Sequence, residues 1–352
     1  MLIGVWNYHE SLHKNNFMLS PFTGSCLGED SMKSFYDFYL KSKKKGYELR
    51  ILNKIKDINK VDLLIFINYP NIKNNIPKYA LTISKPKFLL NYECPTIYPE
   101  TWEKKNFEVF NKIFTWDDNL IDNKKFFKIN CPSYHNPVLE RFDLKKRNEF
   151  CVVICSNKTN DHKYDLYRKR LEIINWFEKN HPDKLDFYGY GWSNYVFKGP
   201  KFIRILNRFK FLTKLFAKKY VTYKGEHSGP KKELLKNYKF SICFENARYY
   251  KGYLTEKIFH CFFSLTIPIY LGTPNITHHI PKECFIDIRN FKSYDDLYEY
   301  LESMSSSEYM NYILSIKKFL KSKKFHPFSI KYFTNLLMKH VELVAINLKK
   351  NA

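Results

Sequence analysis

The chain has 352 residues, of which 44% are hydrophobic and 18% aromatic, so it can form extended cores and is not an intrinsically disordered protein. That length favours two domains of ordinary size over a single one. Lys and Arg outnumber Asp and Glu by 59 to 35, and the formal net charge of +24 indicates an anionic partner such as a phosphate group, a nucleic acid or an acidic membrane surface.

Neither the cysteines nor the hydrophobic runs indicate a secreted or membrane-spanning chain. The eight cysteines include no Cys-x-x-Cys pair, which argues against a zinc site and a disulfide framework and fits a reducing compartment. The first residues, MLIGVWNYHESLHKNN, turn polar after six positions, unlike a signal peptide, and no apolar run reaches about 18 residues. We therefore expect a cytoplasmic protein, either free or peripheral on the inner face of the plasma membrane.

Short apolar runs alternate with mixed segments in the first half of the chain, which is typical of an α/β fold. Strands are predicted at 2–6, 61–68, 87–92 and 112–115. The polar stretch 136–148 precedes a new predicted strand at 150–156, so a domain boundary is expected there. The predicted units are an N-terminal α/β domain (1–147), a C-terminal α/β domain (148–330) and a C-terminal helix or tail (331–352).

The same alternation starts again in the second half. Predicted helices cover 164–180, 231–237 and 256–263, and predicted strands cover 185–190, 239–244 and 266–270. Two such α/β halves that face each other across a cleft form a GT-B-like arrangement of two Rossmann-like domains.

Two basic, amphipathic regions are candidates for contact with an anionic membrane surface. Segment 197–220 carries eight Lys and Arg residues and no acid, and its apolar residues recur at helical spacing. It is either an interfacial helix that rests on lipid headgroups near a lipid-linked acceptor, or an amphipathic helix packed on its own domain. Region 312–349 combines a second basic amphipathic stretch with a predicted terminal helix, and terminal helices more often dock on a core.

The residues after strand 238–244 predict a phosphate-binding site. This apolar run suits a buried parallel strand that ends at Glu245 and Asn246, and ligands of open α/β sheets lie at such ends. Thr255 fits the N-cap of the next helix, whose N-terminus, together with Lys257, favours a diphosphate. Glu256 either accepts hydrogen bonds from ribose or sugar hydroxyls, or only complements the helix dipole.

The order of these elements resembles a known enzyme family. FEN, an aromatic loop, GYLTEK, an apolar helix and TIPIYLGTP, all within 244–274, are similar to the hallmark of family 10 α-1,3/4-fucosyltransferases. Together with YKGEHSGPKKELLKNY at 223–238, the similarity covers most of 150–290. The resemblance implies that the C-terminal domain binds GDP-fucose and requires no cofactor. The donor-binding residues that it implies are Asn246, Tyr253, Glu256, Lys257 and an arginine, which is Arg170 or, as the near alternative, Arg168.

The resemblance also supplies a candidate base in the N-terminal, acceptor-binding domain. The run LLNYECP at 89–95 is similar to a family strand that ends in an acidic element, which implies Glu93 as the general base. Considered alone, Glu93 could equally cap a loop or pair with a lysine. Asp117 and Asp118 form no Asp-x-Asp motif, so we expect no metal site, and Arg170, Lys257 and the helix end would stabilise the leaving group.

The resemblance therefore predicts an inverting α-1,3-fucosyltransferase that moves L-fucose from GDP-fucose to a glycan hydroxyl. The expected acceptor is GlcNAc of an N-acetyllactosamine-type chain or a lipopolysaccharide O-antigen. Cys94 and Ala247–Arg248 depart from the serines usual in the family, at positions outside the proposed chemistry. Alternatives are a transferase of another GDP-hexose, an inactive scaffold of the same fold, and a basic nucleic-acid-binding protein; no nucleic-acid-binding module is recognised, and no nucleic acid is expected as a partner.

Overall fold

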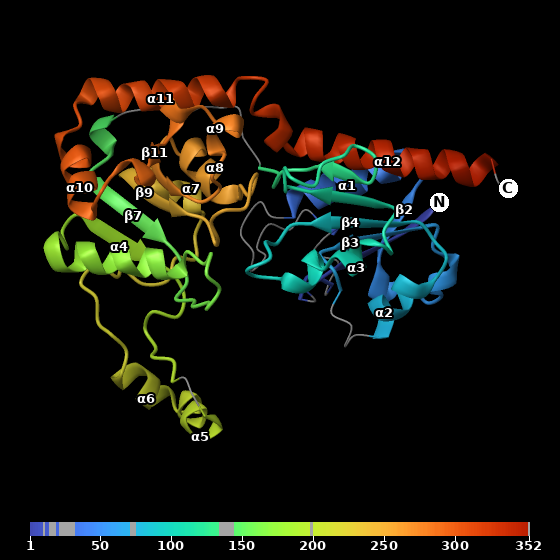
Figure 1. The fold of residues 1–352 in the computed structure, drawn as a ribbon, viewed down its shortest axis with the longest axis horizontal. Helices are drawn as coiled ribbons and strands as arrows, with labels where there is room; N and C mark the ends of the chain where they lie inside the picture. Colours follow the sequence, from blue (N-terminus) through green and yellow to red (C-terminus); the bar gives the residue numbers. More distant parts are fainter. Residues whose placement is uncertain are drawn as a thin grey trace.

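The protein folds into two α/β domains that lie side by side (Figure 1). The computed structural model describes residues 1–9, 11–13, 19–20, 32–70, 75–133, 144–197 and 200–350. Each domain contains one sheet, and every strand pair in both sheets is parallel. This confirms the predicted α/β class.

The N-terminal sheet has the strand order β2-β1-β3-β4-β5-β6. Its strands are β1 (Leu2–Asn7), β2 (Glu48–Ile51), β3 (Leu63–Ile67), β4 (Lys87–Asn91), β5 (Lys112–Thr115) and β6 (Phe126–Lys128), and its helices are α1 (Lys33–Lys44), α2 (Asn75–Thr82) and α3 (Lys104–Phe107). The side chains of β3 alternate between two hydrophobic clusters: Leu63 and Ile65 face one, and Leu64 and Phe66 the other. Because both faces of the sheet are covered, its central strands are continuously apolar.

The C-terminal sheet has the order β11-β10-β9-β7-β8. Its strands are β7 (Glu149–Ile154), β8 (Leu185–Tyr188), β9 (Tyr238–Phe244), β10 (Ile267–Leu271) and β11 (Ile286–Asp287). The helices are α4 (Tyr167–Asn180), α7 (Lys231–Leu235), α8 (Glu256–Phe263), α9 (Ile276–His279), α10 (Tyr294–Ser303) and α11 (Ser306–Leu320). Ile258, Phe259 and Phe262 of α8 are buried in the core of this domain, so β9, α8 and β10 form one packed βαβ unit.

The last helix, α12 (Ile330–Lys350), crosses back to the first domain and lies beside α1 (Figure 1). Phe333, Leu337 and Val341 recur at helical spacing and are buried in the same cluster as Phe35 and Phe38 of α1. The segment predicted as a C-terminal helix or tail thus forms a helix that packs on the N-terminal domain. Within the described part of the chain, no helix combines the length and the apolar character needed to cross a membrane.

Segment 197–220 does not form the single amphipathic helix that its spacing suggested. It contains the short helices α5 (Lys201–Arg204) and α6 (Lys210–Leu215), separated by a 3-10 turn at Ile205–Arg208. The side chain of Asn207 accepts a hydrogen bond from the backbone N–H of Phe197 (2.8 Å) and donates one to its carbonyl (2.9 Å). Asparagine often competes with helical hydrogen bonds in this way. Two residues later, the backbone of Phe209 is extended, which separates the two short helices.

Candidate functional site

Residues that follow strands of the two sheets meet between the domains. Tyr8, Glu93 and Trp116 follow β1, β4 and β5, so they lie at the carboxyl edge of the N-terminal sheet. Glu245 follows β9 at the corresponding edge of the C-terminal sheet. The Trp116 ring lies 4.8 Å from the ring of Tyr253, which belongs to the loop after β9. The two carboxyl edges, where α/β sheets bind ligands, therefore face each other.

Glu245 is a fully buried carboxylate that organises the start of α8. Its side chain is 0% exposed and accepts hydrogen bonds from the Thr255 backbone N–H (2.9 Å) and the Thr255 hydroxyl (2.7 Å). The Nζ of Lys257 lies 3.4 Å from its Oε2. The hydroxyl of Thr255 also accepts from the backbone N–H of Lys257, which confirms the predicted N-cap. Sequence reasoning placed Glu245 only at the strand end and missed its role as the anchor of this turn.

Opposite charges in the first turn of α8 keep both of its ionisable side chains charged. Burial lowers the pKa of Lys257, but Glu245 and Glu256 outweigh it and raise that pKa to about 12. Burial likewise raises the pKa of Glu256, but Lys257 and Lys231 reverse the effect and lower it to about 2. The Lys257 side chain remains 27% exposed. The helix N-terminus thus presents a cation to an anionic ligand, beside a carboxylate that can accept hydrogen bonds.

Of the two candidate arginines on α4, Arg170 is the one at this site. Its Nη2 donates to the carbonyls of Phe244 (2.7 Å) and Glu245 (2.6 Å) and to the Oδ1 of Asn246 (3.1 Å). Its charge also acts on Lys257. Arg168 is exposed, and its Nη2 lies 3.8 Å from Oδ1 of Asp161. Arg170 therefore fixes the end of β9 and orients Asn246, and its contact with a donor stays a prediction.

Glu93 is held at the edge of the N-terminal sheet by its backbone and by Tyr8. The Oδ1 of Asn68 accepts from the backbone N–H of Glu93 (3.1 Å), and the Glu93 carbonyl accepts from the Trp102 indole (2.9 Å). The Tyr8 hydroxyl donates to the carboxylate Oε1 at 2.7 Å. The sequence pattern of an acid at a strand end did not point to Tyr8, which lies 85 positions earlier in the chain, after another strand of the same sheet.

The environment of Glu93 raises its pKa, chiefly because burial disfavours the charged form. The Tyr8 hydrogen bond and the charge of Lys257 oppose this effect, whereas Glu256 adds to it. The neighbouring Cys94 is buried in one cluster with Tyr253 of the C-terminal domain, so Glu93 lies beside the domain interface. A partly buried carboxyl group with a raised pKa is suited to accept a proton.

Tyr253 lies inside the domain interface. It is 2% exposed and belongs to a small cluster with Cys94 and Trp116 from the N-terminal domain and with Ala247. In this structure its ring therefore packs the two domains together, and its predicted contact with the donor is untested.

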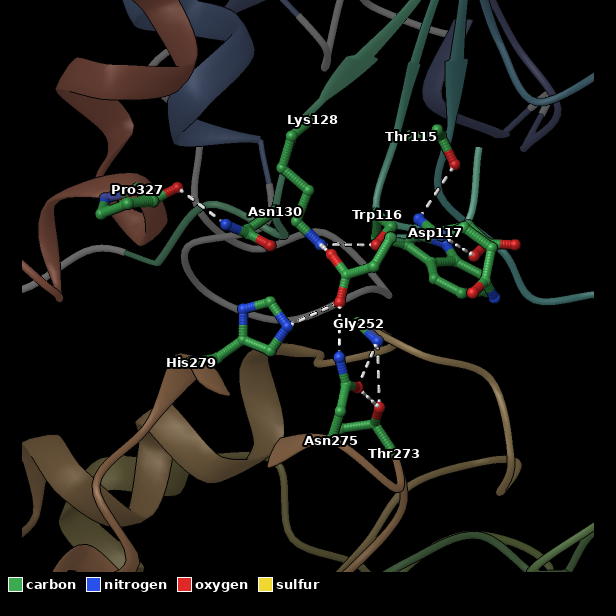
Figure 2. Close-up of polar contacts among 12 residues, drawn as sticks. Thr115, Trp116, Asp117, Lys128, Asn130, Gly252, Thr273, Asn275, His279 and Pro327 are labelled. Carbon is green, nitrogen blue, oxygen red and sulfur yellow. Dashed lines mark hydrogen bonds and ion pairs between the residues drawn. The ribbon is translucent and has the colours of Figure 1, made fainter. Parts of the chain in front are cut away.

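A second set of contacts joins the domains around Asp118 (Figure 2). Its carboxylate pairs with Lys128 Nζ (2.7 Å) from its own domain, and accepts from Asn275 Nδ2 (2.7 Å) and His279 Nε2 (2.8 Å) of the other domain. The backbone N–H of Gly252 donates to Asn275 Oδ1 at 2.9 Å. We call Asp118, Lys128, Gly252, Asn275 and His279 the interdomain latch.

Sequence reasoning considered Asp118 only as a possible metal ligand, rejected that role, and missed the latch. Asp117 turns away from it and accepts from the backbone N–H of Asn119 (2.9 Å). In the described ranges, no group of three or more His, Cys, Asp and Glu side chains is arranged to hold a metal ion.

Known proteins are similar to this chain in sequence and in fold. The model of the glycosyltransferase family 10 (fucosyltransferase) C-terminal domain matches residues 144–335. An α-(1,3)-fucosyltransferase of Helicobacter pylori is 43% identical over 72 residues, which are 20% of this chain and 15% of that protein. The 4-galactosyl-N-acetylglucosaminide 3-α-L-fucosyltransferase 9 of Mus musculus is 33% identical over 78 residues, or 21% of each chain. The matches thus span only about a fifth or less of these relatives.

The likeness in structure extends over both domains. The crystal structure of an α1,3-fucosyltransferase with GDP-fucose superposes with a TM-score of 0.56, covering 96% of this chain and 89% of that one at 16% sequence identity. This shows the GT-B fold, two Rossmann-like domains that face each other, as expected from the sequence. The family match covers more than half of the 352 residues and includes all of β7 to β11. The chain therefore belongs to glycosyltransferase family 10, the fucosyltransferases.

Proposed function

We propose that the protein is an inverting α-1,3-fucosyltransferase that uses GDP-fucose as its donor. The observation that carries the proposal is that Glu93 lies at the edge of the N-terminal sheet beside the domain interface, next to Cys94, which packs with Tyr253 of the opposite domain. Transfer between two separately bound substrates requires a base near the acceptor and a phosphate-binding group near the donor. In this proposal one domain supplies the base and the other supplies the helix N-terminus that binds the phosphates. Family membership and the activities for which the relatives are named support the donor.

In this proposal the donor diphosphate lies at the N-terminus of α8. Lys257 and the positive end of the α8 dipole stabilise its charge, and Arg170 adds a further positive charge nearby. Asn246 and Glu256 accept hydrogen bonds from donor hydroxyls. No metal ion is needed to balance the charge in this scheme.

Glu93 accepts the proton of the acceptor hydroxyl as that oxygen attacks the anomeric carbon. The new carbon–oxygen bond forms on the face opposite the departing GDP, which leaves with the electron pair of the broken bond. One displacement inverts the anomeric centre and requires no covalent enzyme intermediate. Tyr8 holds Oε1 of the base during this step.

We further propose a GlcNAc hydroxyl of an N-acetyllactosamine-type chain as the acceptor, because the mouse relative is named for such a substrate. A lipopolysaccharide O-antigen is the alternative, and either would be modified in the cytoplasm. A product-structure assay with GDP-fucose and both acceptor types tests this choice. Transfer from a different GDP-hexose, with none from GDP-fucose, would replace the donor in the proposal.

The decisive experiment separates donor binding from catalysis. GDP should raise the melting temperature of the wild type, because a ligand that binds only the native state stabilises it. Glu93→Gln should keep that shift and lower kcat by about 100-fold or more. Lys257→Ala should weaken GDP binding by about tenfold or more, since a charge-assisted contact is lost.

Matched controls use charges outside the site. Glu100→Gln and Lys179→Ala change exposed side chains of the same types and should leave both measurements unchanged. No melting shift at saturating GDP would refute the transferase proposal, and DNA binding with a steep salt dependence would then favour a nucleic-acid-binding protein. Wild-type activity in Glu93→Gln would remove Glu93 from the mechanism.

A further inference from the structure

Residues 200–221, which we call the arm, project away from both domains and contain α5 and α6 (Figure 1). The arm exposes an unusual number of large apolar side chains, with Phe202 71% and Phe211 74% exposed. The others are Ile205, Phe209, Leu215, Phe216 and Val221. A surface of this kind on a monomeric domain marks an interaction site.

The exposed side chains of the arm are held outward by a defined structure. The backbone N–H of Tyr195 donates to the Thr213 carbonyl (2.7 Å), and the buried Thr213 hydroxyl donates to Asn194 Oδ1 (3.2 Å). The rings of Phe197 and Phe216 lie 5.6 Å apart. At the base of the arm, Glu178 accepts from the backbone N–H of Val221 at 2.7 Å. These contacts fix the backbone of the arm, so its apolar side chains are exposed in a folded segment.

The charge of the arm identifies the kind of partner. The arm contains no acidic residue and seven basic ones: Lys201, Arg204, Arg208, Lys210, Lys214, Lys218 and Lys219. An anionic partner is required, and it must also receive apolar side chains. Nucleic acid would accept the aromatic rings by stacking, but it offers nothing comparable to the aliphatic Ile205, Leu215 and Val221. An anionic bilayer offers phosphate headgroups to the lysines and arginines of the arm, and an acyl region to all of its apolar side chains.

We propose that the arm docks the protein on the surface of an anionic bilayer. Phe202 and Phe211 enter the boundary between headgroups and acyl chains, and the lysines and arginines contact the headgroups. The short helices lie on the membrane and do not cross it. If the transferase proposal above also holds, this docking keeps the site close to lipid-linked acceptors, a consequence that rests on the proposed function.

The second region predicted to contact a membrane, 312–349, is built differently. Ile313, Ile316 and Phe319 of α11 are buried in the C-terminal core, and Leu337 and Val341 of α12 in the N-terminal core. Their apolar faces are thus already covered by protein. The region still carries exposed side chains of the same types as the arm, so it supplies matched controls.

The test is cosedimentation of the full-length protein with vesicles of phosphatidylcholine alone or mixed with phosphatidylglycerol. Two double variants remove the arm's apolar and basic contacts: Phe202→Ser with Phe211→Ser, and Lys210→Gln with Lys214→Gln. The controls are Leu314→Ser with Leu343→Ser, and Lys323→Gln with Lys324→Gln, all exposed in 312–349. We expect binding to the anionic vesicles only, weakened about tenfold or more by each arm pair and unchanged by each control pair.

Two further measurements make the outcome unambiguous. The melting temperature of each variant reports folding, and the GDP-induced melting shift, which the arm variants should retain, reports the proposed active site separately. The proposal is overturned if the wild-type protein does not bind anionic vesicles, or if the arm variants bind them as tightly as the wild type does. Tighter binding to a DNA oligonucleotide than to vesicles, lost in the same arm variants, would overturn it in favour of nucleic acid.

Discussion

Tyr8→Phe tests whether the hydrogen bond to Glu93 tunes the proposed base. The Tyr8 hydroxyl donates to Glu93 Oε1 at 2.7 Å, and it stabilises the charged form of a carboxyl group whose pKa burial has raised. The other charges that act on Glu93 are Lys257 and Lys158, which favour ionisation, and Glu256, which opposes it. All three remain in the variant, so the change isolates the contribution of the phenol.

The size of the effect follows from the type of bond. A hydrogen bond to a charged group contributes about 1.5–3 kcal/mol, and 1.36 kcal/mol corresponds to one pH unit. The base acts only when ionised, so activity rises with pH through the pKa of Glu93. Removing the donor should move this acid limb of kcat/KM upward by about one pH unit or more. The loss of activity should be largest at acidic pH and should disappear at alkaline pH.

The assay is the pH profile of kcat/KM for fucosyl transfer, with the melting temperature as a check on folding. Tyr69→Phe is the matched control, because Tyr69 is a half-buried tyrosine of the same domain that does not interact with Glu93. Its acid limb should coincide with that of wild type. If Tyr8→Phe has the wild-type limb as well, Tyr8 only fills space and the reasoning is refuted.

Two further predictions concern the interdomain latch. Gly252→Ala should lower the free energy of unfolding by about 2–4 kcal/mol, because φ is +82° and the new Cβ would lie 2.3 Å from a backbone carbonyl of the other domain. Gly46→Ala is the control, because Gly46 has φ +75° but no atom within 4 Å of the new Cβ. Its free energy of unfolding, measured by urea denaturation, should fall by only about 1 kcal/mol. Equal losses in the two variants would contradict tight docking at Gly252.
Burial raises the pKa of Asp118, but His279 and Lys128 outweigh it and lower that pKa below its usual range. The stability that Asp118 contributes is therefore present above pH of about 4 and lost as the pH falls through the lowered pKa. Melting temperatures of Asp118→Asn should fall less steeply with acid than those of wild type, and parallel curves would refute the assignment.

The C-terminal half of the site could be predicted because its signals are local. The strand 238–244, the N-cap Thr255 and the helix 256–263 follow one another, and the structure has β9, the cap and α8 at these positions. The Asp118 contacts could not be predicted in this way, because Asn275 and His279 lie 157 and 161 positions further along the chain. The prediction of one helix at 197–220 was wrong for another reason. The apolar residues have helical spacing, but the side chain of Asn207 hydrogen-bonds to the backbone of Phe197, and the segment forms two short helices.

One loop connects the latch with the proposed donor site. Gly252 binds Asn275, Tyr253 packs on Trp116, and Thr255 hydrogen-bonds to Glu245, so a few consecutive residues contact both domains and the start of α8. A shift of the domains must therefore move either this loop or the contacts that fix it. Glu93 belongs to the opposite domain, so its distance from Lys257 depends on the same loop. We therefore expect closure of the domains and alignment of the proposed base with the donor to be one structural event. Gly252 suits this loop because its φ of +82° is a conformation that residues with a side chain rarely adopt.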